Sequence, residues 1–312
     1  MKILGVLLIF LALFSGCRFF KGDPYRNTPI SGKCFIAVDE TFRPVMEAEI
    51  ELFKGIYGYS EIVARYLPES RVFDLLLKDS VQMIIATRML RTDEVSVLNN
   101  RQLFPKQLKI ATDAIALIVH PSCKDSLLTI KRIKAILGGE ITSWNQLDHE
   151  CPSHPIKLLF DNKNSGIVKY LADSICQGAF SAANASAMEY NCEVIEYTAS
   201  HPDVLGFVST SWIGNRNDSL HLSFHKKIKV VSVSNSSVPT LQNSYKPYQA
   251  DLLDNMYPLS RSVYIINAEP RSGLATGLAS FIASDKGQRI ILKSGIVPAV
   301  APTRVINVRP DL

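Results

Sequence analysis

Residues 156–171, Ile-Lys-Leu-Leu-Phe-Asp-Asn-Lys-Asn-Ser-Gly-Ile-Val-Lys-Tyr-Leu, combine an apolar run, a polar turn and the start of an apolar helical pattern. The run Ile156 to Phe160 predicts a short buried strand, and apolar residues recur at helical spacing from Ile167 onward. A helix that begins at such a turn leaves its first backbone N–H groups unpaired, at the positive end of its dipole. We therefore expect an oxyanion site here, with an ordinary connection capped by Ser165 as the alternative.

Two more strand, turn and helix patterns precede this stretch. A predicted strand from Lys33 to Val38 leads to Thr41 and a helix that begins near Pro44. The next predicted strand ends at Tyr66, and Ser70 stands at the start of the helix that follows. Hydroxyl and free N–H groups are thus expected at three separate turns.

An arginine stands where another buried strand ends. The apolar run Val81 to Ala86 is followed by Thr87-Arg88. A guanidinium group offers a planar fork to an oxyanion, so Arg88 is a candidate ligand. The alternative is a surface arginine that pairs with Asp93 or Glu94.

Length and composition favour a two-domain globular protein. The chain has 312 residues, 47% of them hydrophobic and 20% charged, which accommodates two cores. The net charge of +5 is scattered, without the runs of Lys and Arg among aromatic residues that indicate nucleic-acid binding. A long strand from Lys109 to His120 and a second from Ser262 to Ile266 predict two crossovers between lobes. Strands that alternate with helices predict α/β layers.

The first residues carry a targeting signal. Lys2 and a short apolar run precede Ser15-Gly16-Cys17. The run is too short for a stable membrane span and is typical of a signal peptide. Small residues before a cysteine resemble the bacterial lipobox, so residues 1–17 are predicted to end in a lipidated Cys17, and residues 18–32 to form a tether. The alternative is a secretory signal that is cut elsewhere.

The remaining cysteines predict no metal or redox motif. An odd number leaves at least one of them unpaired, and their pairing stays open. No Cys-x-x-Cys occurs, and no spacing matches a zinc site, so we expect neither a metal nor a cofactor. These cysteines are Cys34, Cys123, Cys151, Cys176 and Cys192.

The order of these motifs resembles the periplasmic substrate-binding protein of phosphate ABC transporters. That family is a two-lobed α/β clamshell of type II, with two crossover strands and its ligand in the cleft between the lobes. The resemblance assigns residues 33–113 and 263–312 to the first lobe and residues 114–262 to the second. It rests on Thr41-Phe42, Asp113-Ala-Ile-Ala-Leu-Ile-Val, Gly139-Glu-Ile-Thr-Ser-Trp-Asn, Asn164-Ser165-Gly166, Gly206-Phe207-Val208, Tyr257-Pro-Leu-Ser-Arg261, Gly287-Gln-Arg-Ile290 and Gly295-Ile-Val-Pro298.

The resemblance also implies a set of phosphate ligands. The family supplies hydroxyl and backbone donors from the segments that match Thr41-Phe42, Ser70 and Ser165-Gly166, and Asn164 belongs to the last of these turns. The expected set is Thr41, Phe42, Ser70, Thr87, Arg88, Asp161, Asn164, Ser165 and Gly166.

Two positions depart from the family pattern. The family's Ser-Gly turn follows an arginine and an aspartate, where this chain has Asp161 and Lys163. The family's acidic residue at the end of a first-lobe strand accepts the phosphate proton and helps to reject sulfate; here Thr87-Arg88 stands in its place. We expect an exchange of charges, in which Asp161 accepts the phosphate proton or pairs with Arg88.

The implied function is that of a lipid-anchored periplasmic protein that captures inorganic phosphate and delivers it to an ABC permease. Neither catalysis nor an oligomer is needed, so a monomer that is not an enzyme is expected. One alternative is a binding or sensory lipoprotein for another oxyanion, such as sulfate or molybdate. The other is a hydrolase that uses Ser165 or a free cysteine, although no Gly-x-Ser-x-Gly elbow occurs.

Overall fold

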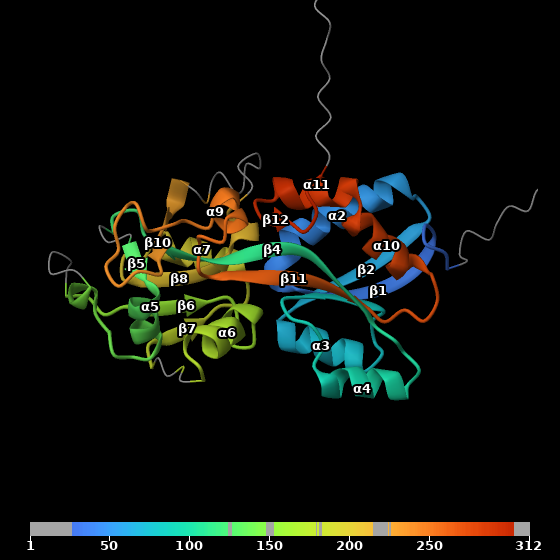
Figure 1. Cartoon of the computed structure of the whole chain (residues 1–312), viewed down its shortest axis with the longest axis horizontal. Coiled ribbons are helices and arrows are strands. Elements are labelled where there is room, and N and C mark those ends of the chain that lie inside the picture. The colour runs from blue at the N-terminus through green and yellow to red at the C-terminus, as the bar shows by residue number, and fades with distance from the viewer. Residues whose placement is uncertain are drawn as a thin grey trace, which may run out of the picture.

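Two lobes lie side by side and are joined by a pair of long strands in the computed structural model (Figure 1). It describes residues 27–123, 127–147, 153–178, 180, 183–214, 224 and 226–302. The predicted signal peptide and lipidation site at Cys17 lie outside these residues, as does Cys151. Within the described part of the chain, no helix has the length and apolar character needed to cross a membrane.

The joining strands are β4 (Lys106–Val119) and β11 (Ser260–Asn267). Residues 106–114 of β4 pair antiparallel with β11, and residues 115–119 pair antiparallel with β8 (Val204–Ser209). One strand thus belongs to the sheets of both lobes, in the order β2-β1-β3-β11-β4-β8-β6-β7. The predicted pair of crossover strands and the α/β class are confirmed.

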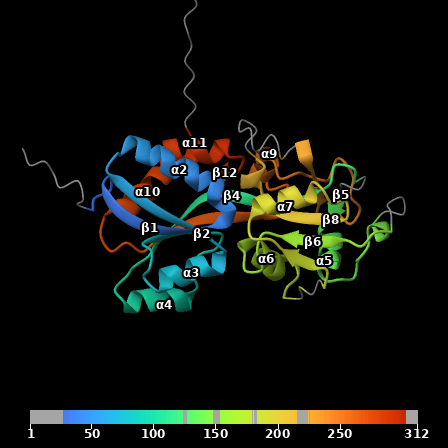
Figure 2. The ribbon, with the colours of Figure 1, turned by 180° about the vertical axis from the view of Figure 1, so that it is seen from behind.

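The first lobe is a mainly parallel sheet between two helical layers (Figure 2). Along β1, Ile36 and Val38 pack in the core beneath the two C-terminal helices, whereas Ala37 packs in the core on the other face. Both sets are apolar because helices cover both faces. Its elements are β1 (Gly32–Asp39), η1 (Glu40–Phe42), α2 (Arg43–Ile56), β2 (Ser60–Leu67), α3 (Glu69–Leu77), β3 (Met83–Ala86), α4 (Thr92–Asn100), α10 (Leu274–Ala283), α11 (Asp285–Lys293) and β12 (Val297–Pro298).

The second lobe repeats this layered plan. Ile115 and Leu117 of β4 pack in the core on one face, and Ala116 and Ile118 in the core on the other. Its elements, besides β8, are β5 (Leu127–Thr129), α5 (Ile130–Leu137), η2 (Trp144–Gln146), β6 (Lys157–Phe160), α6 (Gly166–Tyr170), η3 (Leu171–Ile175), β7 (Ala185–Ala187), α7 (Asn191–Thr198), η4 (Thr210–Trp212), β9 (Lys229–Val230), β10 (Ser232–Ser234) and α9 (Gln249–Leu253).

Most elements with strong periodicity appear where the sequence predicts them, including β6, the turn and α6. The polar stretch from Val238 to Asp254 carries no helical pattern, yet its residues 249–253 form α9. Helix α7 was not predicted. Its buried apolar residues, Val194 and Ile195, are adjacent and do not recur at helical spacing, so its sequence carries a weak helical pattern.

Candidate ligand-binding site

The turn between β6 and α6 carries the predicted N-cap. The Oγ atom of Ser165 accepts a hydrogen bond from the Val168 N–H at 3.3 Å. The N–H groups of Gly166 and Ile167 occupy the first two helical positions, where the helix itself provides no partner. These two donors are therefore available to an acceptor that approaches the turn.

Gly166 brings this turn against the first lobe. A Cβ atom added at Gly166 would lie 2.7 Å from Oδ2 of Asp39, 3.1 Å from Oγ1 of Thr87 and 3.2 Å from Nη1 of Arg261. Only glycine leaves room for this approach. The helix start of the second lobe thus meets a carboxyl, a hydroxyl and a guanidinium group.

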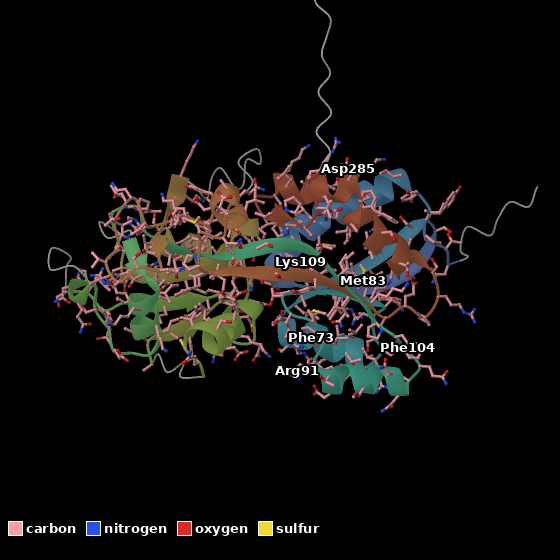
Figure 3. All side chains as sticks on the ribbon, in the orientation of Figure 1. Phe73, Met83, Arg91, Phe104, Lys109 and Asp285 are labelled. Carbon is pink, nitrogen blue, oxygen red and sulfur yellow. The ribbon has the colours of Figure 1, made fainter. Side chains whose placement is uncertain are left out.

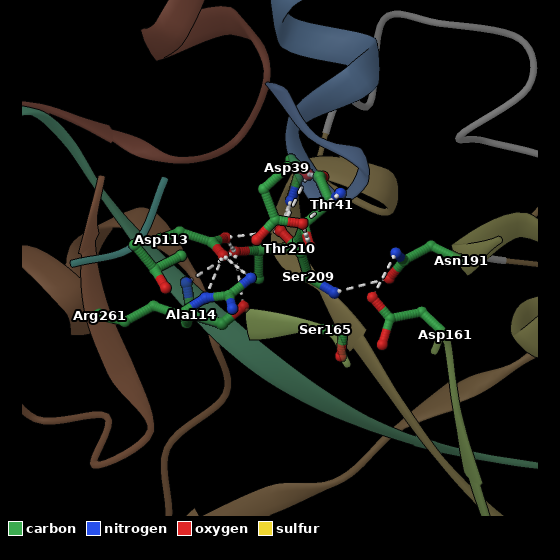
Figure 4. A network of polar contacts seen from close by, with 12 residues as sticks. Asp39, Thr41, Asp113, Ala114, Asp161, Ser165, Asn191, Ser209, Thr210 and Arg261 are labelled. Carbon is green, nitrogen blue, oxygen red and sulfur yellow. Dashed lines mark hydrogen bonds and ion pairs between the residues drawn. The ribbon is translucent and has the colours of Figure 1, made fainter. Parts of the chain in front are cut away.

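Arg261 is the cation at this point of contact (Figure 4). Its Nε and Nη2 atoms both lie 3.0 Å from Oδ2 of Asp113, and both side chains are buried. Oδ1 of Asp113 accepts hydrogen bonds from the hydroxyls of Ser209 and Thr210 at 2.8 and 2.7 Å. Nη1 of Arg261 has no hydrogen-bond partner among the described residues. Asp113 therefore balances the charge, while one N–H edge of the guanidinium is left for another acceptor.

Asp39, rather than Thr41, caps the turn that ends β1. Its Oδ1 atom accepts the Thr41 N–H at 3.2 Å and the Thr41 hydroxyl at 2.7 Å. Oδ2 has no partner among the described residues. Burial raises the pKa of Asp39 well above its ordinary range; Glu69 adds to this effect and Arg261 opposes it. The expected free hydroxyl of Thr41 is thus engaged, and Phe42 is buried with its ring 5.4 Å from the Arg261 guanidinium.

Thr87 is hydrogen-bonded beside the inter-lobe contact, whereas Ser70 lies on the surface. The N–H and hydroxyl of Thr87 donate to Oε1 of Glu69 at 2.7 and 2.5 Å, and Glu69 is buried. Ser70 is exposed. The start of α3 therefore presents the carboxyl of Glu69 near the site, instead of the expected serine hydroxyl.

Arg88 pairs with Glu94, which is one of the two pairings that the sequence analysis gave as the alternative to ligand binding. Its Nη1 and Nη2 atoms lie 2.7 and 2.8 Å from the two carboxyl oxygens of Glu94. Its guanidinium also lies 3.5 Å from the ring centroid of Phe73, which belongs to the α3 layer (Figure 3). Burial tends to raise the pKa of Glu94. Hydrogen bonds from Arg88 and the Arg91 N–H outweigh burial and hold this pKa below its ordinary value. The fork of Arg88 is occupied, and Arg261 is the cation beside the Ser-Gly turn.

Asp161 contacts the first lobe through an asparagine that the sequence analysis missed. Nδ2 of Asn191 donates to Oδ2 of Asp161 at 3.1 Å and to Oε2 of Glu40 at 2.7 Å. Figure 4 shows Asp161 and Asn191 beside the Ser165 turn. Lys163 and Asn164 are exposed, so the expected contribution of the Asn164 side chain is not seen.

The carboxyl groups of Glu40 and Asp161 are strongly affected by burial. Burial raises the pKa of Glu40 to about 7; the Asn191 hydrogen bond opposes this change and Asp161 adds to it. Burial also raises the pKa of Asp161, against the effects of a Ser165 hydrogen bond and of Arg261. Oε1 of Glu40 and Oδ1 of Asp161 have no partner among the described residues. No local signal pointed to Asn191, whereas Asp39 could have been found as an Asx residue two positions before Thr41.

These residues form an inter-lobe site, defined here as Asp39, Glu40, Thr87, Asp161, Ser165, Gly166, Asn191 and Arg261. It offers donors at the helix start and on Arg261, and acceptors on three carboxyl groups. Among the described residues, His, Cys, Asp and Glu side chains form no group suited to a metal ion. Cys34, Cys176 and Cys192 are free thiols.

Comparison with known proteins agrees with this architecture. The phosphate-binding protein PstS of Borreliella burgdorferi is 23% identical over 265 residues, which cover 82% of this chain and 86% of that protein. PstS of Pseudomonas aeruginosa is 22% identical over 288 residues, covering 87% and 84%.

Solved structures share the fold. A phosphate ABC transporter substrate-binding protein from Clostridium perfringens, with bound phosphate, aligns with a TM-score of 0.71 at 21% identity, covering 86% of this chain and all of that one. An ABC-type phosphate transport receptor from Vibrio cholerae aligns with a TM-score of 0.63 at 16% identity, with coverage of 86% and 100%. The model of the PBP superfamily domain matches residues 23–286. The chain is therefore a member of the family that this PBP superfamily domain defines.

Proposed function

We propose that this protein is the solute-binding component of an ABC transporter and that it captures inorganic phosphate between its lobes. The observation that carries this proposal is the contact of the Ser165-Gly166 helix start with the free Nη1 edge of the buried Arg261. Both relatives named above are phosphate-binding proteins, and both similar structures come from phosphate transport systems.

The donors at this contact suit an oxyanion. The N–H groups of Gly166 and Ile167 point out of the helix start, and the field of the helix favours negative charge there. Nη1 of Arg261 supplies a charge-assisted hydrogen bond. Because Asp113 balances this arginine, the anion is held mainly by directed hydrogen bonds rather than by excess positive charge.

The carboxyl groups provide selectivity. Phosphate retains a proton near neutral pH, whereas sulfate does not. A buried carboxyl oxygen such as Oδ2 of Asp39 accepts a hydrogen bond from a P–OH group but repels a sulfate oxygen. In this proposal Asp39 takes the role that the sequence analysis gave to Asp161.

Lobe closure completes the binding. The Ser211 hydroxyl donates to the Thr41 carbonyl at 2.6 Å, and Asn191 donates to Glu40, so hydrogen bonds already join the second lobe to η1. Closure around a bound anion excludes water and strengthens each hydrogen bond to it. Opening of the same contacts at the permease releases the anion, and no covalent step is required.

The cellular setting extends the proposal beyond the described residues. We further propose that residues 1–17 are a lipoprotein signal peptide and that Cys17 carries the lipid. Residues 18–26 then tether a periplasmic monomer to the membrane. The predicted tether of residues 18–32 was too long, because Asn27 accepts a hydrogen bond from the Leu274 N–H and Gly32 begins β1. Palmitate labelling of the protein, lost on Cys17→Ser, is the expected result.

Isothermal titration of the purified protein, stripped of bound solute, tests the ligand. Phosphate should bind at least about tenfold more tightly than sulfate. Asp39→Asn should reduce the difference between the affinities for phosphate and sulfate, because an amide N–H can donate to sulfate. Asp254→Asn, at an exposed position, is the matched control and should leave this difference unchanged. Equal binding of the two anions, or binding of neither, would reject phosphate capture.

A further inference from the structure

Two buried carboxyl groups meet across the lobes beside the amide of Asn191. Glu40 belongs to the first lobe and Asp161 to the second, and one nitrogen donates to both. Glu40 is 4% and Asp161 2% exposed. Each keeps a second oxygen, Oε1 and Oδ1, that has no partner among the described residues. A buried acceptor without a partner indicates a missing donor.

The described residues supply no cation for this pair. Arg261 is balanced by Asp113, and Arg43, the basic group that affects the pKa of Glu40, is itself bonded to Glu47 at 2.8 Å. No ion pair within 4.0 Å is formed by Glu40 or Asp161 in the described part of the chain. Inorganic phosphate can donate its proton to a carboxyl oxygen, but it brings no positive charge to two acids from opposite lobes.

The ligand is the remaining source of positive charge. We infer that the solute carries a primary ammonium group, joined by a short linker to the phosphate or phosphonate group that the Ser165-Gly166 turn binds. The ammonium lies between Oε1 of Glu40 and Oδ1 of Asp161. This inference rests on the proposed function, because it keeps the anion at the same turn and adds a second subsite.

Geometry limits the linker and favours an ammonium. Asp161 and Gly166 belong to one turn, and the Ser165 hydroxyl is close enough to hydrogen-bond with Asp161. The two subsites therefore lie within one turn, so the linker between the two groups of the solute is short. A compact ammonium with three donors suits two separate carboxyl oxygens, whereas a guanidinium needs a planar bidentate partner.

Titration with four matched probes tests this inference. O-phosphoethanolamine carries both groups, ethyl phosphate lacks the amine, ethanolamine lacks the phosphate, and inorganic phosphate is the simple anion. O-phosphoethanolamine should bind about tenfold or more tightly than ethyl phosphate. Ethanolamine alone should bind weakly, because it leaves the turn and Arg261 without an acceptor.

Variants identify the ammonium subsite. Glu40→Gln and Asp161→Asn keep the shape but remove a negative charge, so each should reduce the advantage of O-phosphoethanolamine over ethyl phosphate to about twofold or less. The two affinities are compared within each variant, so a general change in phosphate binding does not affect the ratio. The exposed acids Glu51→Gln and Asp173→Asn are controls and should preserve the full advantage.

The outcomes separate the two proposals. If ethyl phosphate or inorganic phosphate binds as tightly as O-phosphoethanolamine, the ammonium subsite is rejected and phosphate capture stands. If no phosphate compound binds, phosphate capture is rejected and this inference with it. Ethanolamine that binds as tightly as O-phosphoethanolamine would reject the anion subsite, because the phosphate group would then contribute nothing.

Discussion

Arg261 and Asp113 lie directly opposite each other on the two crossover strands and form a buried ion pair. The pair joins β11 to β4 at the point where the two lobes meet, and its carboxyl also accepts the hydroxyls of Ser209 and Thr210 at the end of β8. It therefore links the two crossover strands and fixes Nε and Nη2 of Arg261, while Nη1 has no partner among the described residues.

Loss of Asp113 should destabilise the whole protein. Asp113→Asn leaves the buried guanidinium without its counter-charge, and breaking a buried pair in this way costs roughly 3–5 kcal/mol. Urea unfolding should show a lower free energy of unfolding by that amount. Glu61→Gln, which breaks the exposed pair with Lys33, is the control and should change it by less than about 0.5 kcal/mol. Similar small effects from both changes would contradict the role assigned to the buried pair.

Arg88 should contribute to stability and not to ligand binding. It joins the end of β3 to Glu94 at the start of α4 and stacks on Phe73. Arg88→Ala should lower the free energy of unfolding by about 1–3 kcal/mol, through the lost bidentate pair and the lost ring contact. Phosphate affinity measured by titration should stay within about twofold. A large loss of affinity in a variant that stays folded would instead make Arg88 a ligand.

Stability should fall with rising pH because of Glu49 on α2. This residue is buried, and neither carboxyl oxygen has a partner among the described residues. Burial raises its pKa from 4.5 to about 9. The folded protein therefore holds a proton that the unfolded chain releases, so the favourable contribution present below pH 4.5 is lost progressively as the pH rises to about 9.

Melting temperatures at about pH 5 and about pH 9 check this dependence. Glu49→Gln has no charge to titrate, so its melting temperature should fall less between the two pH values and should exceed that of the unchanged protein at the higher one. Glu51→Gln, exposed on the same helix, should keep the original pH dependence. Identical slopes for Glu49→Gln and the unchanged protein would mean that Glu49 is ionised in the fold.

Sequence patterns predicted the local parts of this molecule and missed what depends on distant contacts. The β6 turn and the N-cap at Ser165 follow from periodicity over a few residues, and both were found. The pairing of Arg88 with Glu94, six residues away, was one of two local alternatives. The arrangement of Arg261 opposite Asp113 joins residues 148 positions apart, and Asn191 reaches Glu40 across 151 positions. No local pattern encodes such distances, so neither of these two contacts could be predicted from the sequence.

Closure of the lobes should depend on the absence of a side chain at Gly166. A Cβ atom there would lie only 2.7 Å from Oδ2 of Asp39, too close for ordinary contact, so Gly166→Ala should hold the lobes apart. Phosphate affinity should fall about tenfold or more, because the Arg261 edge and the helix start no longer converge. The melting temperature without ligand should change little, since each lobe keeps its own core.

Gly55→Ala is the matched control. Its added Cβ meets nothing within 4 Å, and alanine favours the helix α2, so the phosphate affinity should be unchanged. If Gly166→Ala binds phosphate as tightly as Gly55→Ala does, the anion does not sit at this turn, and the assignment of the Ser165-Gly166 helix start as the binding site is wrong.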